Sequence, residues 1–297
     1  MASFIRVECR WLSLLIAALL IAPAPVASAA DNSKNDAPLC DVRAERDILY
    51  YTGPGADKVK HRLDLYLPKG KSDFPVVMFV HGGAWVFGDK DFWGVHEAIG
   101  RMFARHGIGA AVISYRLSPE VQHPEHVKDV ARAFAWLHEN VKKYGGRPDE
   151  LFVCGHSAGG HLVSLLATDE TYLKAEGLSL ADIKGVMPIS GVYLIPDKWF
   201  TEVFGKDPET RKKASPINDV HAGCPPFCVV YGDDDFPTCG ATSERFCEAL
   251  KADKVAAESL EIKKRNHIDI ITGCGKDDDP CAKALVDFVM KHVASDK

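Results

Sequence analysis

The chain has 297 residues, of which 46% are hydrophobic and 26% charged, and its formal net charge is −5. This near-average composition excludes a collagen-like protein, a long disordered chain and a polytopic membrane protein. The mild charge and the absence of a lysine- and arginine-rich run argue against a nucleic-acid partner. The length suits one large domain or two small ones, and nine cysteines are the unusual count.

The first 29 residues are predicted to be a secretory signal peptide. Trp11 to Ala22 is apolar except for Ser13, and Ala27-Ser28-Ala29 supplies the small residues that a signal peptidase reads. Because the apolar run is shorter than the roughly 20 residues of a spanning helix, cleavage is favoured over an uncleaved membrane anchor. We therefore expect a secreted or periplasmic protein with no membrane span after cleavage, with 30–45 as a linker and 46–297 as one folded domain.

Eight cysteines remain after the predicted cleavage. Cys154 and Cys228 lie in apolar runs, where a free cysteine packs as a small hydrophobe. The other six stand in polar or turn-like sequence, and an oxidising compartment favours their pairing as disulfides. The alternative is that several of them stay reduced. These six are Cys40, Cys224, Cys239, Cys247, Cys274 and Cys281. Their connectivity does not follow from the sequence, and they lack the paired CxxC spacing of a zinc site.

Eight strands are predicted in the domain, and helical patterns separate most of the later ones. The first two, Arg46 to Tyr51 and His61 to Leu67, are expected to be antiparallel. Six apolar runs follow, and they are Pro75–Val80, Ile108–Ser114, Leu151–Cys154, Val186–Ile189, Phe227–Tyr231 and Ala257–Lys263. Continuously apolar strands alternating with helices predict an α/β fold, in which a mostly parallel sheet is covered by helices on both faces.

Gly155-His156-Ser157-Ala158-Gly159 follows one of these apolar strands and opens a helix. In this context the Gly-x-Ser-x-Gly pattern predicts a sharp turn that lifts Ser157 above the sheet as a nucleophile. The alternative is an inert glycine- and serine-rich helix cap. His156 and His161 flank the turn and are interpreted as packing or substrate contacts.

His81-Gly82-Gly83-Ala84-Trp85 follows the strand Pro75–Val80. Acyl transfer creates an oxyanion that needs preorganised donors, and glycines leave backbone N–H groups unobstructed. Gly82 and Gly83 are therefore predicted donors, together with the N–H of Ala158, and an ordinary strand-end turn is the alternative. His81 is interpreted as a residue that orients the loop.

A nucleophilic serine needs a base, and the base needs a carboxylate that orients it. Gly232-Asp233-Asp234-Asp235 follows the strand Phe227–Tyr231, and Arg265-Asn266-His267 follows the strand Ala257–Lys263. Because catalytic groups collect at the carboxyl ends of parallel strands, Asp235 and His267 are the predicted acid and base. Asp233 and Asp234 are the alternatives to Asp235 as the acid. The three aspartates together could instead form a solvated charge cluster or a cation site.

With these motifs the sequence resembles the α/β-hydrolase superfamily in its esterase and lipase branch. It resembles hormone-sensitive-lipase-like carboxylesterases, and more closely the kynurenine formamidase and bacterial feruloyl-esterase-like group. Two more stretches carry the resemblance, which covers 46–294, and they are Ser114-Tyr115-Arg116-Leu117 and Ala214-Ser215-Pro216-Ile217. The resemblance implies an α/β-hydrolase fold with Ser157, Asp235 and His267 as the triad and with Gly82, Gly83 and Ala158 as the oxyanion hole.

Two departures from relatives bear on function. Ala84 stands where many lipases of this branch have a third glycine, which favours the formamidase and esterase side. The cap is expected to be small or absent, because only Thr168–Lys184 and Tyr193–Cys224 are long enough to form a lid. Aromatic residues on loops at the same sheet edge are candidates for an acyl or aryl pocket, although each alone is more often packing. They are Trp85, Phe87, Trp93, Trp199 and Phe236.

Three functions remain open at this point. The first is a secreted serine esterase that cleaves small or aromatic esters, such as feruloyl or acetyl groups, without a metal or organic cofactor. The second is an arylformamidase that cleaves an amide at the same site, and export argues against it. The third is a non-catalytic binding protein on the same fold, which an intact set of site residues disfavours.

Overall fold

The computed structural model describes residues 38–293. The predicted signal peptide, residues 1–29, lies outside the described residues, as does most of the predicted linker, residues 30–45. The first strand begins at Val42 rather than at Arg46, so part of that linker belongs to the sheet. Within the described residues, none of the helices combines the length and the apolar character needed to cross a bilayer.

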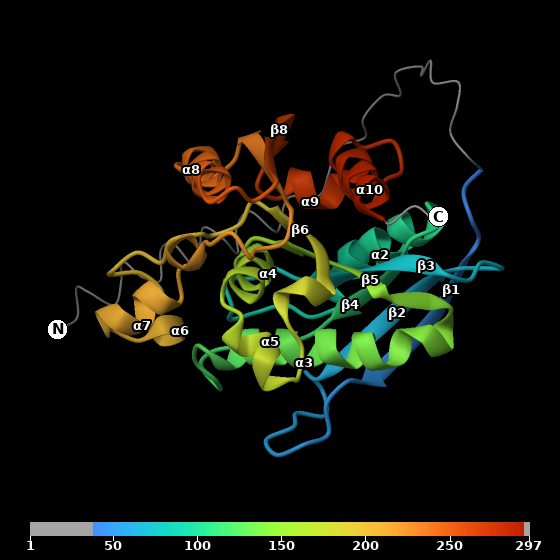
Figure 1. Cartoon of the computed structure of the whole chain (residues 1–297), viewed down its shortest axis with the longest axis horizontal. Helices are drawn as coiled ribbons and strands as arrows, with labels where there is room; N and C mark the ends of the chain where they lie inside the picture. The colour runs from blue at the N-terminus through green and yellow to red at the C-terminus, as the bar shows by residue number, and fades with distance from the viewer. Residues whose placement is uncertain (1–37, 294–297) are drawn as a thin grey trace. The chain divides into compact units, whose positions relative to one another are not determined.

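The described strands form one eight-stranded sheet in the order β1-β2-β4-β3-β5-β6-β7-β8 (Figure 1). They are β1 (Val42–Leu49), β2 (Arg62–Pro68), β3 (Phe74–Val80), β4 (Gly109–Ile113), β5 (Gly146–His156), β6 (Ile183–Ile189), β7 (Phe227–Asp234) and β8 (Ala257–Asn266). β2 pairs antiparallel with both β1 and β4, and every other neighbouring pair is parallel. The predicted eight-stranded, mostly parallel sheet is confirmed.

Helices connect the strands and cover both faces of the sheet. The α-helices are α2 (Val95–Arg105), α3 (Glu125–Asn140), α4 (Ala158–Thr168), α5 (Thr171–Ala175), α6 (Thr201–Phe204), α7 (Pro208–Lys213), α8 (Cys239–Ala252), α9 (Asp269–Gly273) and α10 (Pro280–His292). Short 3-10 turns are η1 (Phe92–Gly94), η2 (Val141–Tyr144), η3 (Leu180–Asp182) and η4 (Pro216–Asp219).

Strand β3 shows how one strand serves two cores. Val76, Met78 and Val80 face a core that includes residues of α3, α4 and α8. Val77 and Phe79 face a second core that includes residues of α2, α9 and α10. Since successive side chains of a strand point to opposite faces, a strand buried on both sides is apolar throughout. This is why continuous apolar runs, and not alternating ones, mark the parallel strands.

Fewer of the described cysteines form disulfides than the sequence predicts. Cys154 and Cys228 are unpaired and buried in the α2 and α10 core, as their apolar surroundings indicated. Of the six cysteines expected to pair, only Cys274 and Cys281 form a disulfide, which links the start of the α9–α10 loop to α10. The prediction is wrong for the other four described residues, since Cys40, Cys224, Cys239 and Cys247 are unpaired. Cys224 and Cys247 are buried in the core that contains residues of α3, α4 and α8, and Cys239 is buried beside Asp235 and Ser190, which local sequence did not reveal.

Of the two segments considered for a lid, one lies at the amino ends of the strands and the other begins at their carboxyl ends. Residues 168–184 begin where α4 ends and lead into the amino end of β6, so they are remote from the carboxyl edge and are not a lid. Residues 193–224 follow the carboxyl end of β6 and contain α6 and α7, which have only four and six residues. Any cap is therefore small.

Candidate active site

Ser157 occupies a strained turn between β5 and α4. Its backbone lies at φ 55° and ψ −116°, a region that L residues rarely adopt. A Cβ atom on Gly159 would lie 2.0 Å from the carbonyl oxygen of Val80, and one on Gly155 would lie 2.4 Å from that of Gly159. Both flanking glycines are therefore required by close backbone approach, and the predicted strand-turn-helix geometry is present.

Asp235 and His267 meet at the carboxyl ends of β7 and β8. Nδ1 of His267 lies 2.7 Å from Oδ1 of Asp235, and both side chains are buried. Burial by itself raises the pKa of Asp235, but the hydrogen bond and charge of His267 and the hydroxyl of Ser190 lower it to about 2. An ionised carboxylate at Nδ1 holds the proton of the neutral imidazole on that nitrogen, which leaves Nε2 as the basic atom.

The two competing aspartates do not reach the histidine. Oδ1 of Asp233 accepts a hydrogen bond from the backbone N–H of Arg265 at 3.2 Å, and this ties β7 to β8. Asp234 is exposed and pairs in register with Asn266. Asp235 alone of the run bends back from the strand toward His267.

His156 supports the loop that carries His267. Its Nε2 donates to the carbonyl oxygen of His267 at 3.0 Å, and the two rings lie 4.7 Å apart. Burial lowers the pKa of His156 well below its usual value, so the ring is neutral. His156 is thus a structural neighbour of the base, consistent with its interpretation as a packing residue.

The glycine loop after β3 lies directly against the nucleophile. A Cβ atom on Gly82 would lie 3.2 Å from Cβ of Ser157. Nδ1 of His81 lies 2.7 Å from the carbonyl oxygen of Gly82, and burial lowers the pKa of His81 to about 3, so a neutral ring donates this bond. Since the C=O and N–H of a planar peptide point in opposite directions, this bond turns the N–H of Gly83 away from His81. The glycine loop thus lies beside Ser157, and its role as an oxyanion hole stays a prediction.

Trp85 was predicted to line a substrate pocket, and this prediction is wrong because only 1% of the residue is exposed. Its Nε1–H donates to Nδ1 of His161 at 3.2 Å, and Nε2 of His161 donates to the carbonyl oxygen of Ala214 at 2.7 Å. The ring also packs against Phe200 and Phe204. These contacts join the glycine loop, α4 and the segment before β7, so the buried Trp85 side chain anchors the glycine loop to the core.

The other aromatic candidates are more accessible. Phe236 is 45% exposed, and its ring lies 4.2 Å from that of His267. Trp93 is 68% exposed and stacks on Phe92 at 4.9 Å, while Phe87 lies against Gly83. Trp199 is 58% exposed on the segment between β6 and α6. Phe236 therefore directly contacts the predicted base.

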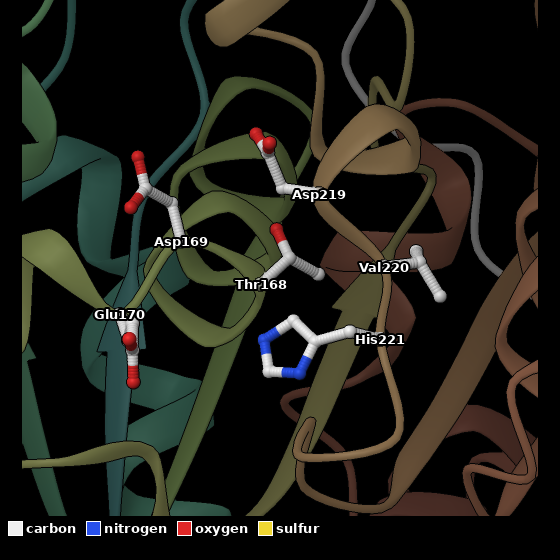
Figure 2. A pocket seen from close by; sticks show the side chains of 6 residues that line it. All are labelled: Thr168, Asp169, Glu170, Asp219, Val220 and His221. Atoms are coloured by element: carbon white, nitrogen blue, oxygen red, sulfur yellow. The ribbon is translucent and has the colours of Figure 1, made fainter.

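A separate hollow of about 350 Å³ lies at the other end of α4. Figure 2 shows that its lining comes from the end of α4 and from the loop that carries Asp219 and His221. Helix α4 has 11 residues, so its two ends are about 16 Å apart. Because Ser157 caps the opposite end, this acidic hollow is not part of the catalytic arrangement.

One residue beside this arrangement was not anticipated. Ser190 follows the carboxyl end of β6, and its hydroxyl donates to Oδ2 of Asp235 at 2.5 Å. The rule that selected Asp235 and His267, a polar residue directly after an apolar strand, also selects Ser190.

Comparisons with known proteins find a matching family and relatives that are named as esterases. The BD-FAE family model matches residues 63–250, a span that contains Ser157 and Asp235 but stops before His267. A probable isoprenylcysteine alpha-carbonyl methylesterase of Oryza sativa is 31% identical over 250 residues, which cover 76% of this chain and 58% of the relative. Esterase LipC of Mycobacterium tuberculosis is 32% identical over 236 residues, which cover 72% of this chain and 58% of the relative. The chain thus spans less than two thirds of these relatives.

Solved structures support the fold. An inhibited esterase B from Lactobacillus Rhamnosis superposes with a TM-score of 0.74 at 20% identity, and the match covers 98% of this chain and 97% of that one. A truncated carbohydrate esterase from gut microbiota has a TM-score of 0.70 at 22% identity and covers 84% of this chain and 96% of its own. These likenesses show the α/β-hydrolase fold.

Proposed function

Because the chain belongs to the BD-FAE family, we propose that it is a carboxylic ester hydrolase that works through Ser157, His267 and Asp235. The observation that carries the proposal is the hydrogen bond between His267 and the ionised Asp235, set at the same sheet edge as a strained Ser157. Relatives and structural neighbours named as esterases support the same reaction class.

The proposed reaction is a two-step acyl transfer. His267 takes the hydroxyl proton of Ser157 at Nε2 as the serine attacks the ester carbonyl carbon, and Asp235 stabilises the imidazolium that forms. Backbone N–H groups of Gly82, Gly83 and Ala158 stabilise the oxyanion, each such donor typically contributing about 2.7–4 kcal/mol. The imidazolium then protonates the leaving alcohol. Water attacks the acyl-enzyme by the reverse proton transfers and releases the acid.

For the substrate we propose a small or aromatic acyl ester, such as an acetyl or feruloyl ester. The exposed ring of Phe236 beside His267 offers an apolar face next to the base. The short helices α6 and α7 leave little cap to enclose a long acyl chain. Hydrolysis of p-nitrophenyl acetate, p-nitrophenyl decanoate, methyl ferulate and N-formylkynurenine tests this choice. We expect kcat/KM to be highest for acetate or ferulate, and a preference for N-formylkynurenine would make the protein an arylformamidase instead.

A fluorophosphonate probe tests the nucleophile itself. We expect one covalent adduct on the peptide containing Ser157, and no adduct on the Ser157→Ala variant. Ser164 is a matched control, since its buried hydroxyl donates to the carbonyl oxygen of Gly160 on the same helix, and Ser164→Ala should label normally. A protein that neither labels nor hydrolyses any of the esters is a binding protein on this fold.

We also propose that the protein is exported after cleavage near residue 29. The support is the sequence of the predicted signal peptide, and its apolar run is too short for a spanning helix. N-terminal sequencing of the mature protein tests this, with a first residue at 30 or 31 expected. A mature protein that retains Met1 in the cytoplasm would contradict it.

A further inference from the structure

Ser190 and His267 bind different oxygens of the Asp235 carboxylate. Oδ1 of Asp235 accepts from Nδ1 of His267 and from the backbone N–H of Phe236, both at 2.7 Å. Oδ2 faces the hydroxyl of Ser190 at 2.5 Å. Ser190 is buried, so water is excluded from this side of the carboxylate. The hydroxyl of Ser190 donates to this second oxygen, and the buried thiol of Cys239 also contacts the carboxylate.

The backbone of Ser190 is itself unusual. Its φ is 50°, in the left-handed region that glycine adopts far more easily than serine. The N–H of Ser190 donates to the carbonyl oxygen of Val230 on β7 at 2.7 Å, so the turn is anchored. A non-glycine residue held in such a conformation beside reacting groups points to a use for its side chain. Here the side chain reaches the carboxylate.

The end of β6 also contacts the nucleophile. The carbonyl oxygen of Ile189 accepts the backbone N–H of Ser157 at 2.9 Å. Strand β6 lies between β5, which carries Ser157, and β7, which carries Asp235. Two consecutive residues, Ile189 and Ser190, thus bind the turn of the nucleophile on one side and the acid on the other.

We propose that Ser190 is a positioning residue that fixes the plane of the Asp235 carboxylate, so that Oδ1 stays aligned with Nδ1 of His267. A carboxylate held only through one oxygen can rotate about its Cβ–Cγ bond and lose this alignment. Hydrogen bonds to charged acceptors are shorter and stronger than neutral ones, so the hydroxyl is suited to this task. The inference rests on the proposed function, since it assigns Asp235 to the triad.

Kinetics of Ser190→Ala and Ser190→Gly test the proposal. Both variants remove the hydroxyl, but only glycine also relieves the positive φ. We expect both to lower kcat on p-nitrophenyl acetate by about tenfold to a hundredfold, with KM within about twofold of wild type. Ser164→Ala, which removes a buried hydroxyl that donates to a helix carbonyl, should keep kcat within about twofold. Wild-type kcat in Ser190→Gly would overturn the proposal.

A double-mutant cycle separates positioning from general support of the fold. In the Asp235→Asn background, adding Ser190→Ala should change kcat by less than about threefold, because the carboxylate that Ser190 acts through is already gone. A further loss as large as in the wild-type background would show that Ser190 acts independently of Asp235, and would overturn the proposal.

The outcome is distinguishable from a failure of the proposed function. If the wild-type protein hydrolyses no ester, the function fails, and the proton resonance of His267 Nδ1–H still reports on the pair. We expect Ser190→Ala and Ser190→Gly to shift or broaden that resonance, with Ser164→Ala leaving it unchanged. An unchanged resonance in both Ser190 variants would overturn the positioning role.

Discussion

Nδ1 of His267 and Oδ1 of Asp235 lie 2.7 Å apart, although 32 positions separate the two residues in the chain. The parallel pairing of β7 and β8 brings them together, because each follows the carboxyl end of its strand. The pair sets which imidazole nitrogen is basic, and so it makes the clearest prediction.

Asp235→Asn should lower kcat about 10³- to 10⁴-fold, because a neutral amide neither stabilises the imidazolium nor fixes the tautomer. Steady-state hydrolysis of p-nitrophenyl acetate measures it. Asp234→Asn is the matched control and should stay within about twofold of wild type, since Asp234 is exposed. Equal losses in the two variants would contradict the assignment of Asp235.

Ser157→Gly should be more stable than Ser157→Ala by about 1 kcal/mol, although neither hydrolyses esters. The φ of 55° and ψ of −116° strain any residue that has a Cβ atom, and glycine relieves the strain. Urea denaturation gives the two free energies of unfolding. An alanine variant that is as stable as the glycine variant would show that the turn stores no strain.

Asp129→Asn should lower the free energy of unfolding by about 3–5 kcal/mol. Asp129 is fully buried, with its carboxylate 2.9 Å from Nε2 of His61 and 2.8 Å from guanidinium nitrogens of Arg116 and Arg132. This contact explains the role of the arginine in Ser114-Tyr115-Arg116-Leu117. Glu139→Gln is an exchange of the same kind at a more exposed site on the same helix, and it should change the free energy by less than about 0.5 kcal/mol.

The same aspartate makes folding sensitive to acid. Burial raises the pKa of Asp129, but His61 and Arg116 lower it to about 2 in the folded state, below the unfolded value of about 3.9. Because its pKa is lower in the folded state, ionised Asp129 stabilises the fold by about 2.5 kcal/mol above pH 4. This contribution to the free energy of unfolding is lost as the pH falls toward 2. Urea denaturation between pH 5 and pH 2 should therefore show a shallower pH dependence for Asp129→Asn than for wild type. Parallel curves would contradict this account.

Trp85→Phe should lower the free energy of unfolding by about 1–3 kcal/mol. It removes the donor to Nδ1 of His161 and leaves that buried nitrogen without its partner. Trp93→Phe, at an exposed tryptophan, should change the free energy by less than about 0.5 kcal/mol. Thermal unfolding of both variants makes the comparison, and equal shifts would contradict a structural role for the Trp85 contact.

Thiol titration of denatured, unreduced residues 30–297 should find six free thiols. The structure pairs only Cys274 with Cys281 and leaves the six other described cysteines unpaired. A count of two would instead support three bridges, as the sequence suggested for an exported protein. A count of eight would mean that the Cys274–Cys281 bridge does not form in solution.

The catalytic candidates were open to prediction because each is tied to a local pattern. Ser157, Asp235 and His267 all follow apolar strands, and parallel strands present their carboxyl ends at one edge. Ser190 follows the same rule but belongs to a residue type that is abundant in turns, so position alone did not single it out. Trp85 was misjudged because a loop residue beside a motif can point inward as readily as outward.

The sequence by itself determined the alternation of buried strands and helices, the turn around Ser157 and the edge where polar residues collect, since all of these depend on spacing along the chain. Only the tertiary structure decided which of Asp233, Asp234 and Asp235 faces His267, which cysteines meet and which aromatic rings are exposed. Those outcomes depend on side-chain direction and on contacts between residues far apart in the chain. Packing sets both, and a linear pattern does not carry them.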